Sequence, residues 1–140
     1  MQTLTSRLST LELLVSHWAI TGDAEGETTY GWMDGGFFLI QRGRLTRDGT
    51  THSFIELIGY ERGFGATETP VDITSRVYTT SGDTLDYTYE CDDRTVTIWG
   101  GPKGSPAAFR ARWSEDHSVL RGAWEWPGGG YATVMTRVDG

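Results

Sequence analysis

One carboxylate stands out in this sequence, because Glu56 lies within the otherwise apolar run Phe54-Ile55-Glu56-Leu57-Ile58. If its side chain faces a dry interior, the loss of hydration raises the pKa of the carboxyl group and suits it to act as a general acid or base. If it faces solvent, it is an ordinary charged residue of a strand. In a strand, alternate side chains point to opposite faces, and both sets in this run are partly apolar. The alternation therefore leaves the two orientations of Glu56 open.

Two tyrosines are the hydrogen-bond donors that we expect to act with this carboxylate. Tyr87 and Tyr89 alternate with Thr88 and Glu90, so both rings point to the same side of a strand. Phenol groups beside a carboxylate base can polarise a carbonyl or stabilise an enolate. Buried tyrosine hydroxyls also commonly bond the backbone and do nothing more, which is the structural alternative. The candidate catalytic residues are therefore Glu56, Tyr87 and Tyr89.

Aromatic residues recur at every second position along other strand-like runs. Phe109 and Trp113 share one row, and Trp124 and Trp126 share another, each alternating with charged or small neighbours. Such rows can line a cavity for a flat or polyunsaturated guest, or they can pack against one another as a solid core. The candidate ligand-contacting residues are Trp32, Phe37, Leu39, Gln41, Tyr60, Tyr78, Phe109, Trp113, Trp124, Trp126 and Met135.

The sequence shows no pattern for a metal or a cofactor, and we expect neither. His17, His52 and His117 fall on different expected elements, without the spacing of a zinc site. None of them lies on a clearly apolar inward row, which argues against an axial haem ligand. Cys91 falls on an inward row and is interpreted as a small hydrophobic residue. The glycine-rich stretches lack the strand-to-helix context of a phosphate-binding loop.

Short strands separated by turn signals must position these residues. Glycine-containing turns such as Asp48-Gly49 and Gly128-Gly129-Gly130 punctuate the chain. Apolar residues at helical spacing predict a short amphipathic helix over 4–16, which would cap one end. The stretch 62–70 is predicted to be a long loop. The expected strands are 17–24, 27–33, 37–47, 51–61, 71–80, 84–91, 94–99, 107–114, 119–126 and 131–138.

These elements predict an all-β protein with a single domain over residues 1–140. About eight to ten strands joined mostly by tight turns favour an antiparallel up-and-down β-barrel, because closure removes exposed sheet edges. A barrel of this size is wide enough to hold a small ligand. A two-sheet sandwich with a solid core is the alternative.

The composition of the chain limits the classes of molecule that it is expected to bind. The net charge of −7 argues against nucleic acid, because phosphates need a basic surface. Arg42, Arg44 and Arg47 cluster on one expected strand and are interpreted as an exposed edge face. The sequence has no apolar run of membrane-spanning or signal-peptide length, so we expect no membrane partner and a cytoplasmic location. The partner expected is a hydrophobic small molecule, and a homodimer is left open.

The segment Leu14-Val15-Ser16-His17-Trp18 resembles the first strand of calycin-type barrels. In lipocalins a tryptophan there closes one end of the barrel, and an arginine from the last strand lies over it. Trp18 and Arg137 stand at the corresponding places, and such a pair is a favourable cation–π interaction. Ser16 replaces the glycine usual in that motif.

Two further segments, 30–39 and 56–60, resemble a bacterial family of small, uncharacterised calycin-like domains. The resemblance extends over nearly the whole chain and implies a fold, with no established chemistry. Relatives by architecture include lipocalins, fatty-acid-binding proteins, haem-binding nitrobindins and small barrel cyclases of natural-product pathways.

Two functions therefore remain open. The first is a binding module that holds a hydrophobic, aromatic or polyunsaturated small molecule within the barrel. The second is a cofactor-free cyclase or isomerase of secondary metabolism, which would fold a flexible substrate inside the cavity and use one or two polar groups. A purely structural role ranks last, because the expected inward rows are dense in tryptophan.

Overall fold

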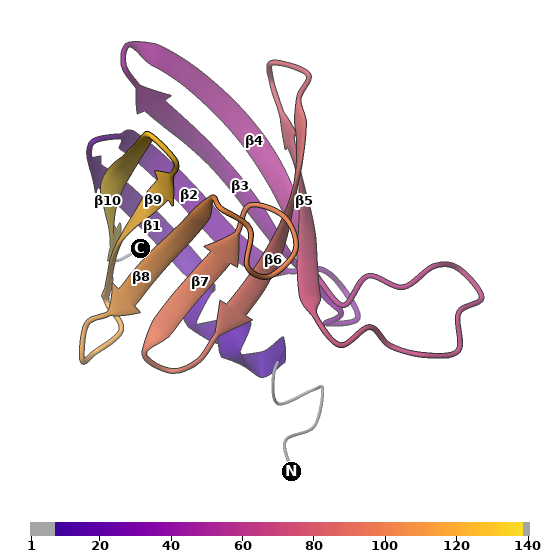
Figure 1. Cartoon of the computed structure of the whole chain (residues 1–140). Coiled ribbons are helices and arrows are strands. Elements are labelled where there is room, and N and C mark those ends of the chain that lie inside the picture. The colour runs from indigo at the N-terminus through magenta and orange to yellow at the C-terminus, as the bar shows by residue number, and fades with distance from the viewer. Residues whose placement is uncertain (1–7, 139–140) are drawn as a thin grey trace.

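The computed structural model describes residues 8–138, and within them the chain forms a closed antiparallel barrel of ten strands (Figure 1). This confirms the predicted all-β up-and-down barrel. A 3-10 helix, η1 (Thr10–Leu14), precedes it. The strands are β1 (Ser16–Gly22), β2 (Glu25–Trp32), β3 (Phe38–Arg47), β4 (Thr50–Gly59), β5 (Ile73–Thr79), β6 (Thr84–Cys91), β7 (Thr95–Trp99), β8 (Ala108–Trp113), β9 (Val119–Trp126) and β10 (Gly129–Arg137).

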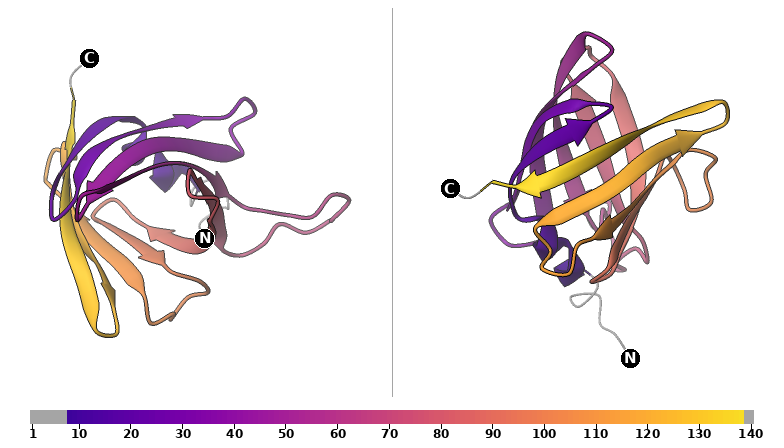
Figure 2. Two further views of the ribbon diagram at one scale, coloured as in Figure 1. Left: turned by 90° about the horizontal axis from the view of Figure 1, so that it is seen from above. Right: turned by 90° about the vertical axis from the view of Figure 1, so that its left-hand side faces the viewer.

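Each strand pairs with the next one in the sequence, and the pairing of β1 with β10 closes the sheet (Figure 2). The first and last strands meet in register, with Trp18 opposite Arg137 and Gly22 opposite Thr133. Such closure leaves no strand with an unpaired edge. A closed antiparallel barrel of this kind is consistent with a calycin-like fold.

Most strand boundaries lie within two residues of the prediction, and β6 and β9 coincide with it. The N-terminal helix differs. Among the described residues Leu8 and Ser9 are helical and the 3-10 helix Thr10–Leu14 follows them, ending because Val15 is extended, with φ −66° and ψ 103°. Leu4, which began the predicted helix, lies outside the described residues.

The packed core fills the end of the barrel that η1 covers (Figure 1). Leu11 and Trp18 are completely buried there, and the Trp18 indole Nε1 donates a hydrogen bond to the Leu14 carbonyl oxygen at 2.8 Å. The Trp113 ring lies 5.6 Å from the Trp18 ring, centroid to centroid. These large side chains close this end, which we call the closed end.

Arg137 lies over the Trp18 indole as predicted, with its guanidinium carbon 5.0 Å from the ring centroid. The same side chain donates a hydrogen bond from its guanidinium group to the His117 carbonyl oxygen at 3.1 Å. Arg137 therefore fixes the last strand and the β8–β9 turn against the buried indole.

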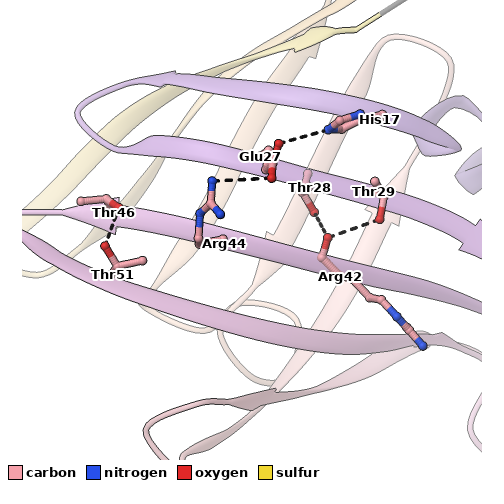
Figure 3. Close-up of polar contacts among 8 residues, drawn as sticks. All are labelled: His17, Glu27, Thr28, Thr29, Arg42, Arg44, Thr46 and Thr51. Carbon is pink, nitrogen blue, oxygen red and sulfur yellow. Dashed lines mark hydrogen bonds and ion pairs between the residues drawn. The ribbon is translucent and has the colours of Figure 1, made fainter. Parts of the chain in front are cut away.

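The predicted arginine cluster on β3 divides between the two faces of the wall. Arg42 and Arg44 are exposed on the outer face, where Arg44 pairs with Glu27 at 3.5 Å (Figure 3). Arg47 occupies the opposite row. The interpretation as an exposed edge face was wrong, because β3 is paired on both sides with β2 and β4 and has no free edge.

We predict that Arg137→Ala will lower the free energy of unfolding by about 1–2 kcal/mol, because it removes one cation–π contact and one hydrogen bond. For a domain of this size that corresponds to a melting temperature lower by about 3–8 °C. Arg121→Ala, at an exposed position of β9, is the control and should change stability by less than about 0.5 kcal/mol. Equal melting temperatures for Arg137→Ala and the wild type would contradict a stabilising role for this pair.

Candidate functional site

A cavity of about 230 Å³ occupies the barrel interior beyond the packed closed end. It opens to solvent at the other end, since Leu85 lines it and is 43% exposed. The short turns β1–β2, β3–β4, β5–β6 and β9–β10 surround this open end (Figure 1). The lining residues are Leu14, Ile20, Tyr30, Gln41, Leu45, Phe54, Glu56, Val77, Thr79, Leu85, Tyr87, Tyr89, Val96, Ile98, Phe109, Leu120, Trp124, Tyr131, Thr133 and Met135.

Strand register places Glu56 on the inner face of the wall. Glu56 is opposite Gln41 on β3 and Val77 on β5, and all three side chains are buried. Glu56 itself is 3% exposed. Of the two orientations that the sequence left open, the structure therefore has the inward one.

Two hydroxyl groups hold the Glu56 carboxyl group. Ser75 Oγ donates a hydrogen bond to Oε2 at 2.6 Å, and the Tyr89 hydroxyl donates to the same oxygen at 2.7 Å. Within residues 8–138 no hydrogen bond reaches the other oxygen, Oε1. Glu56 lines the cavity, so this second oxygen is available to a guest.

Burial raises the pKa of Glu56 above its ordinary value, and the hydrogen bonds from Ser75 and Tyr89 oppose that rise. Burial also raises the pKa of Tyr30, Tyr87 and Tyr89, and in each case the nearby Glu56 charge raises it further. The three phenols therefore stay protonated at neutral pH. Among the described residues no lysine, arginine or histidine lines the cavity, so nothing neutralises an ionised Glu56.

A second polar group, Gln41, is oriented by its neighbours. Thr28 Oγ1 donates a hydrogen bond to the Arg42 carbonyl oxygen at 3.1 Å (Figure 3). Because this uses the hydroxyl proton of Thr28, Oγ1 accepts from Gln41 Nε2, which lies 2.9 Å away. The amide nitrogen of Gln41 is thus directed to Thr28, and the Gln41 side chain also hydrogen-bonds the Tyr30 hydroxyl group.

Trp124 lies at the centre of the aromatic wall. Its ring centroid is 5.3 Å from that of Tyr87 and 5.8 Å from that of Phe109, and the ring pairs are tilted by 42° and 45°. Tilted pairs at these distances are favourable for aromatic rings. The three side chains form one continuous apolar surface facing Glu56 and its donors.

Arg47 lies at the open end and contacts two rings of the opposite hairpin. Its guanidinium carbon is 4.3 Å from the Tyr131 ring centroid and 5.6 Å from that of Trp126. In the order of strands around the barrel, β2 and β1 separate β3 from β10 and β9, so this side chain joins strands that are not neighbours. The Arg47 side chain is 39% exposed, so it forms part of the rim.

Seven of the predicted site residues line the cavity, and seven do not. Those that line it are Gln41, Glu56, Tyr87, Tyr89, Phe109, Trp124 and Met135. The structure thus brings the three candidate catalytic residues together around one cavity, with Glu56 and Tyr89 in direct contact.

Of the others, four belong to the closed end. Leu39 and Trp113 are buried in the packed core there, and Tyr60 packs against it. Trp32 also packs against this core, and its indole donates a hydrogen bond to Glu12 at 3.0 Å. They were predicted to contact a ligand, but they pack at the closed end and do not line the cavity.

The remaining three are at the surface or the rim. Phe37 precedes β3 and is 68% exposed, and Tyr78 points outward from β5 and is 45% exposed. Trp126 ends β9 at the rim, where its ring meets that of Tyr131 at 6.1 Å. None of the three lines the cavity.

Sequence reasoning missed Tyr30, Ser75 and Tyr131. Tyr30 lies opposite Gln41 in the register of β2 and β3, and Tyr131 begins the inward row of β10 that contains Met135. The alternation of β10 could have indicated Tyr131. Nothing in the sequence indicated that Ser75 would face Glu56, because that contact depends on the register of β4 and β5.

No protein-family model matches this chain, and no curated protein matches its sequence significantly. Within residues 8–138, no group of three or more histidine, cysteine, aspartate or glutamate side chains could hold a metal ion. No helix in the same range has the length and apolar character needed to cross a membrane.

We predict that Glu56→Gln becomes more stable relative to the wild type as pH rises. The folded-state pKa of Glu56 lies above its unfolded-state value, so the wild type loses stability as pH rises from about 4.3 through the folded-state pKa. Glutamine does not ionise and avoids this loss. The loss is about 1.4 kcal/mol for each tenfold difference in proton affinity between folded and unfolded Glu56.

Urea unfolding of both proteins between pH 4 and 8 measures this difference. Glu25→Gln, at an exposed position of β2, is the matched control. A stability difference between Glu56→Gln and the wild type that stays constant over this range would show that Glu56 does not titrate abnormally.

Proposed function

We propose that the barrel binds a small hydrophobic molecule that contains an aromatic ring. The observation that carries this proposal is the cavity of about 230 Å³, walled by Tyr87, Phe109 and Trp124 and open at one end. A cavity of roughly 150 Å³ is enough for benzene in an apolar protein core. The volume therefore suits a single ring with a short substituent, or a compact bicyclic molecule, better than a long polyunsaturated chain.

The resemblance to calycin-type barrels supports this proposal by analogy of architecture. The barrel closes by pairing of its first and last strands, and Arg137 covers Trp18 at the closed end. These features are consistent with a calycin-like barrel, and by this analogy we propose that the barrel interior holds a ligand.

The first test uses tryptophan fluorescence with 4-nitrotoluene, an aromatic quencher of about the right size. Binding should quench part of the emission in a saturable way, because Trp124 lines the cavity. Trp124→Phe should remove most of the saturable quenching, whereas Trp126→Phe, a rim substitution, should retain it. Quenching that shows no saturation in the wild type would argue against a ligand cavity.

A second test fills the cavity. Val77 is 5% exposed and lines it, so Val77→Phe should weaken binding of 4-nitrotoluene at least tenfold, as measured by isothermal titration calorimetry. Thr136→Phe adds the same ring at an exposed position of β10 and should leave the affinity unchanged within about twofold. Equal affinities for the two variants would place the guest outside the barrel.

The second candidate function is a cofactor-independent isomerase or cyclase, and the free Oε1 of Glu56 favours it specifically. An ionised Glu56 with a raised pKa is a stronger base than an exposed carboxylate, and Tyr87 can donate a hydrogen bond to a developing enolate. In this mechanism Glu56 removes a proton from the carbon next to a carbonyl group. It then returns the proton at another position.

Phenylacetone in D₂O tests this chemistry directly. The wild type should accelerate exchange of the protons next to the carbonyl group at least 100-fold over Glu56→Gln, as followed by proton NMR. Tyr78→Phe, on the outer face of β5, should exchange at the wild-type rate. Equal exchange rates for the wild type and Glu56→Gln would leave the binding function alone.

A further inference from the structure

We infer that the guest of this cavity carries an amine, and that its ammonium group pairs with Glu56 while its ring lies against Trp124. This inference rests on the proposed binding function and names the chemical class of the ligand. It follows from which polar atoms of the cavity wall lack partners, and from the sign of the charge that the wall can carry.

The first observation is the unequal use of the two Glu56 oxygens. Ser75 and Tyr89 both donate to Oε2, and among the described residues Oε1 accepts no hydrogen bond. A carboxyl group that is 3% exposed loses most of its hydration, so an unpartnered oxygen at the cavity wall is unfavourable. A guest with N–H donors satisfies this oxygen directly.

The second observation is the composition of the wall around that oxygen. Gln41 is already bonded to Thr28 through its amide nitrogen and to the Tyr30 hydroxyl group, and its carbonyl oxygen can only accept hydrogen bonds. The hydroxyl group of Tyr87, which also lines the cavity, can accept a hydrogen bond as well. An ammonium group has three N–H donors and no acceptor, so it matches such a wall.

The third observation concerns charge. Among the described residues no basic side chain lines the cavity, so a bound anion would face Glu56 without a neutralising partner. The aromatic faces of Tyr87 and Trp124 attract cations instead. The net charge of −7 also attracts cations to the protein from solution. Arg47 at the rim opposes this locally, but it already contacts the Tyr131 and Trp126 rings.

The test uses three probes that share a phenyl ring and a two-carbon arm and differ in the terminal group. They are 2-phenylethylamine, 2-phenylethanol and 3-phenylpropanoate, and their affinities are measured by isothermal titration calorimetry at pH 7.5. We expect the amine to bind the wild type at least tenfold more tightly than the alcohol, and the carboxylate to bind most weakly. Glu56→Gln should lose the preference for the amine and retain affinity for the alcohol within about threefold.

The pH dependence of the wild type provides a measurement that does not depend on any variant. Around Glu56 the facing groups are Tyr30 on β2, Gln41 on β3, Ser75 on β5, and Tyr87 and Tyr89 on β6. The phenols stay protonated between pH 5 and 8, and burial raises the pKa of the nearby Cys91 thiol to about 12. Affinity for the amine should therefore rise with pH as Glu56 ionises, while affinity for the alcohol should not.

The outcomes separate this inference from the proposed function. If the alcohol or the carboxylate binds as tightly as the amine, the inference is overturned and the cavity remains a binding site. If none of the three probes nor 4-nitrotoluene binds, both fail together. If Glu56→Gln does not fold, the wild-type pH profile decides, since a flat profile for the amine rules out pairing with Glu56.

Discussion

The pairing of β1 with β10 is the constraint on which the rest of the structure depends. It converts a sheet with two faces into a wall with an inside and an outside, so every strand must keep one row of side chains within the barrel. A slip of one residue on β3 would bring Arg42 inside and turn Gln41 out to solvent. The register that places Glu56 opposite Gln41 and Val77 is a consequence of this closure.

The two ends of the barrel use arginine and aromatic rings in different ways. At the closed end Arg137 covers the completely buried Trp18, and Trp113 packs against the same indole. These rings fill the interior at the closed end and limit the depth of the cavity. At the open end Arg47 lies against Tyr131 on the rim, where it stays partly exposed and leaves the interior hollow.

The buried carboxyl group of Glu56 does not serve the stability of the fold. A buried carboxyl group opposes folding, and an apolar side chain of similar size at position 56 would avoid its desolvation. Ser75 and Tyr89 reduce this penalty by bonding one oxygen, and among the described residues the other oxygen accepts no hydrogen bond. The arrangement is compatible with a small molecule bound in the cavity, as in the proposed function.

The strand pattern made much of the fold predictable. Alternation along β6 correctly assigned Tyr87 and Tyr89 to one row, and the same reasoning placed Phe109 and Trp124 inside. It failed for Phe37, which precedes its strand, and for Trp126, which ends β9 and does not line the cavity. Tyr78, which was predicted as a hydrogen-bond donor, lies on the outer row of β5. Depth along the barrel was not predictable, so Leu39 and Trp113 were grouped with the cavity although they pack at the closed end.

The sequence by itself determined that the chain is built from short strands and where most of the turns lie, because side-chain period and turn residues are local properties of the chain. It also determined that the β6 row is inward, since one row is apolar and the other charged. Only the tertiary structure decided that Glu56 faces inward, which end is open, and which donors meet the carboxyl group. These depend on the registers between strands and on barrel closure, which arise from contacts between residues far apart in the sequence.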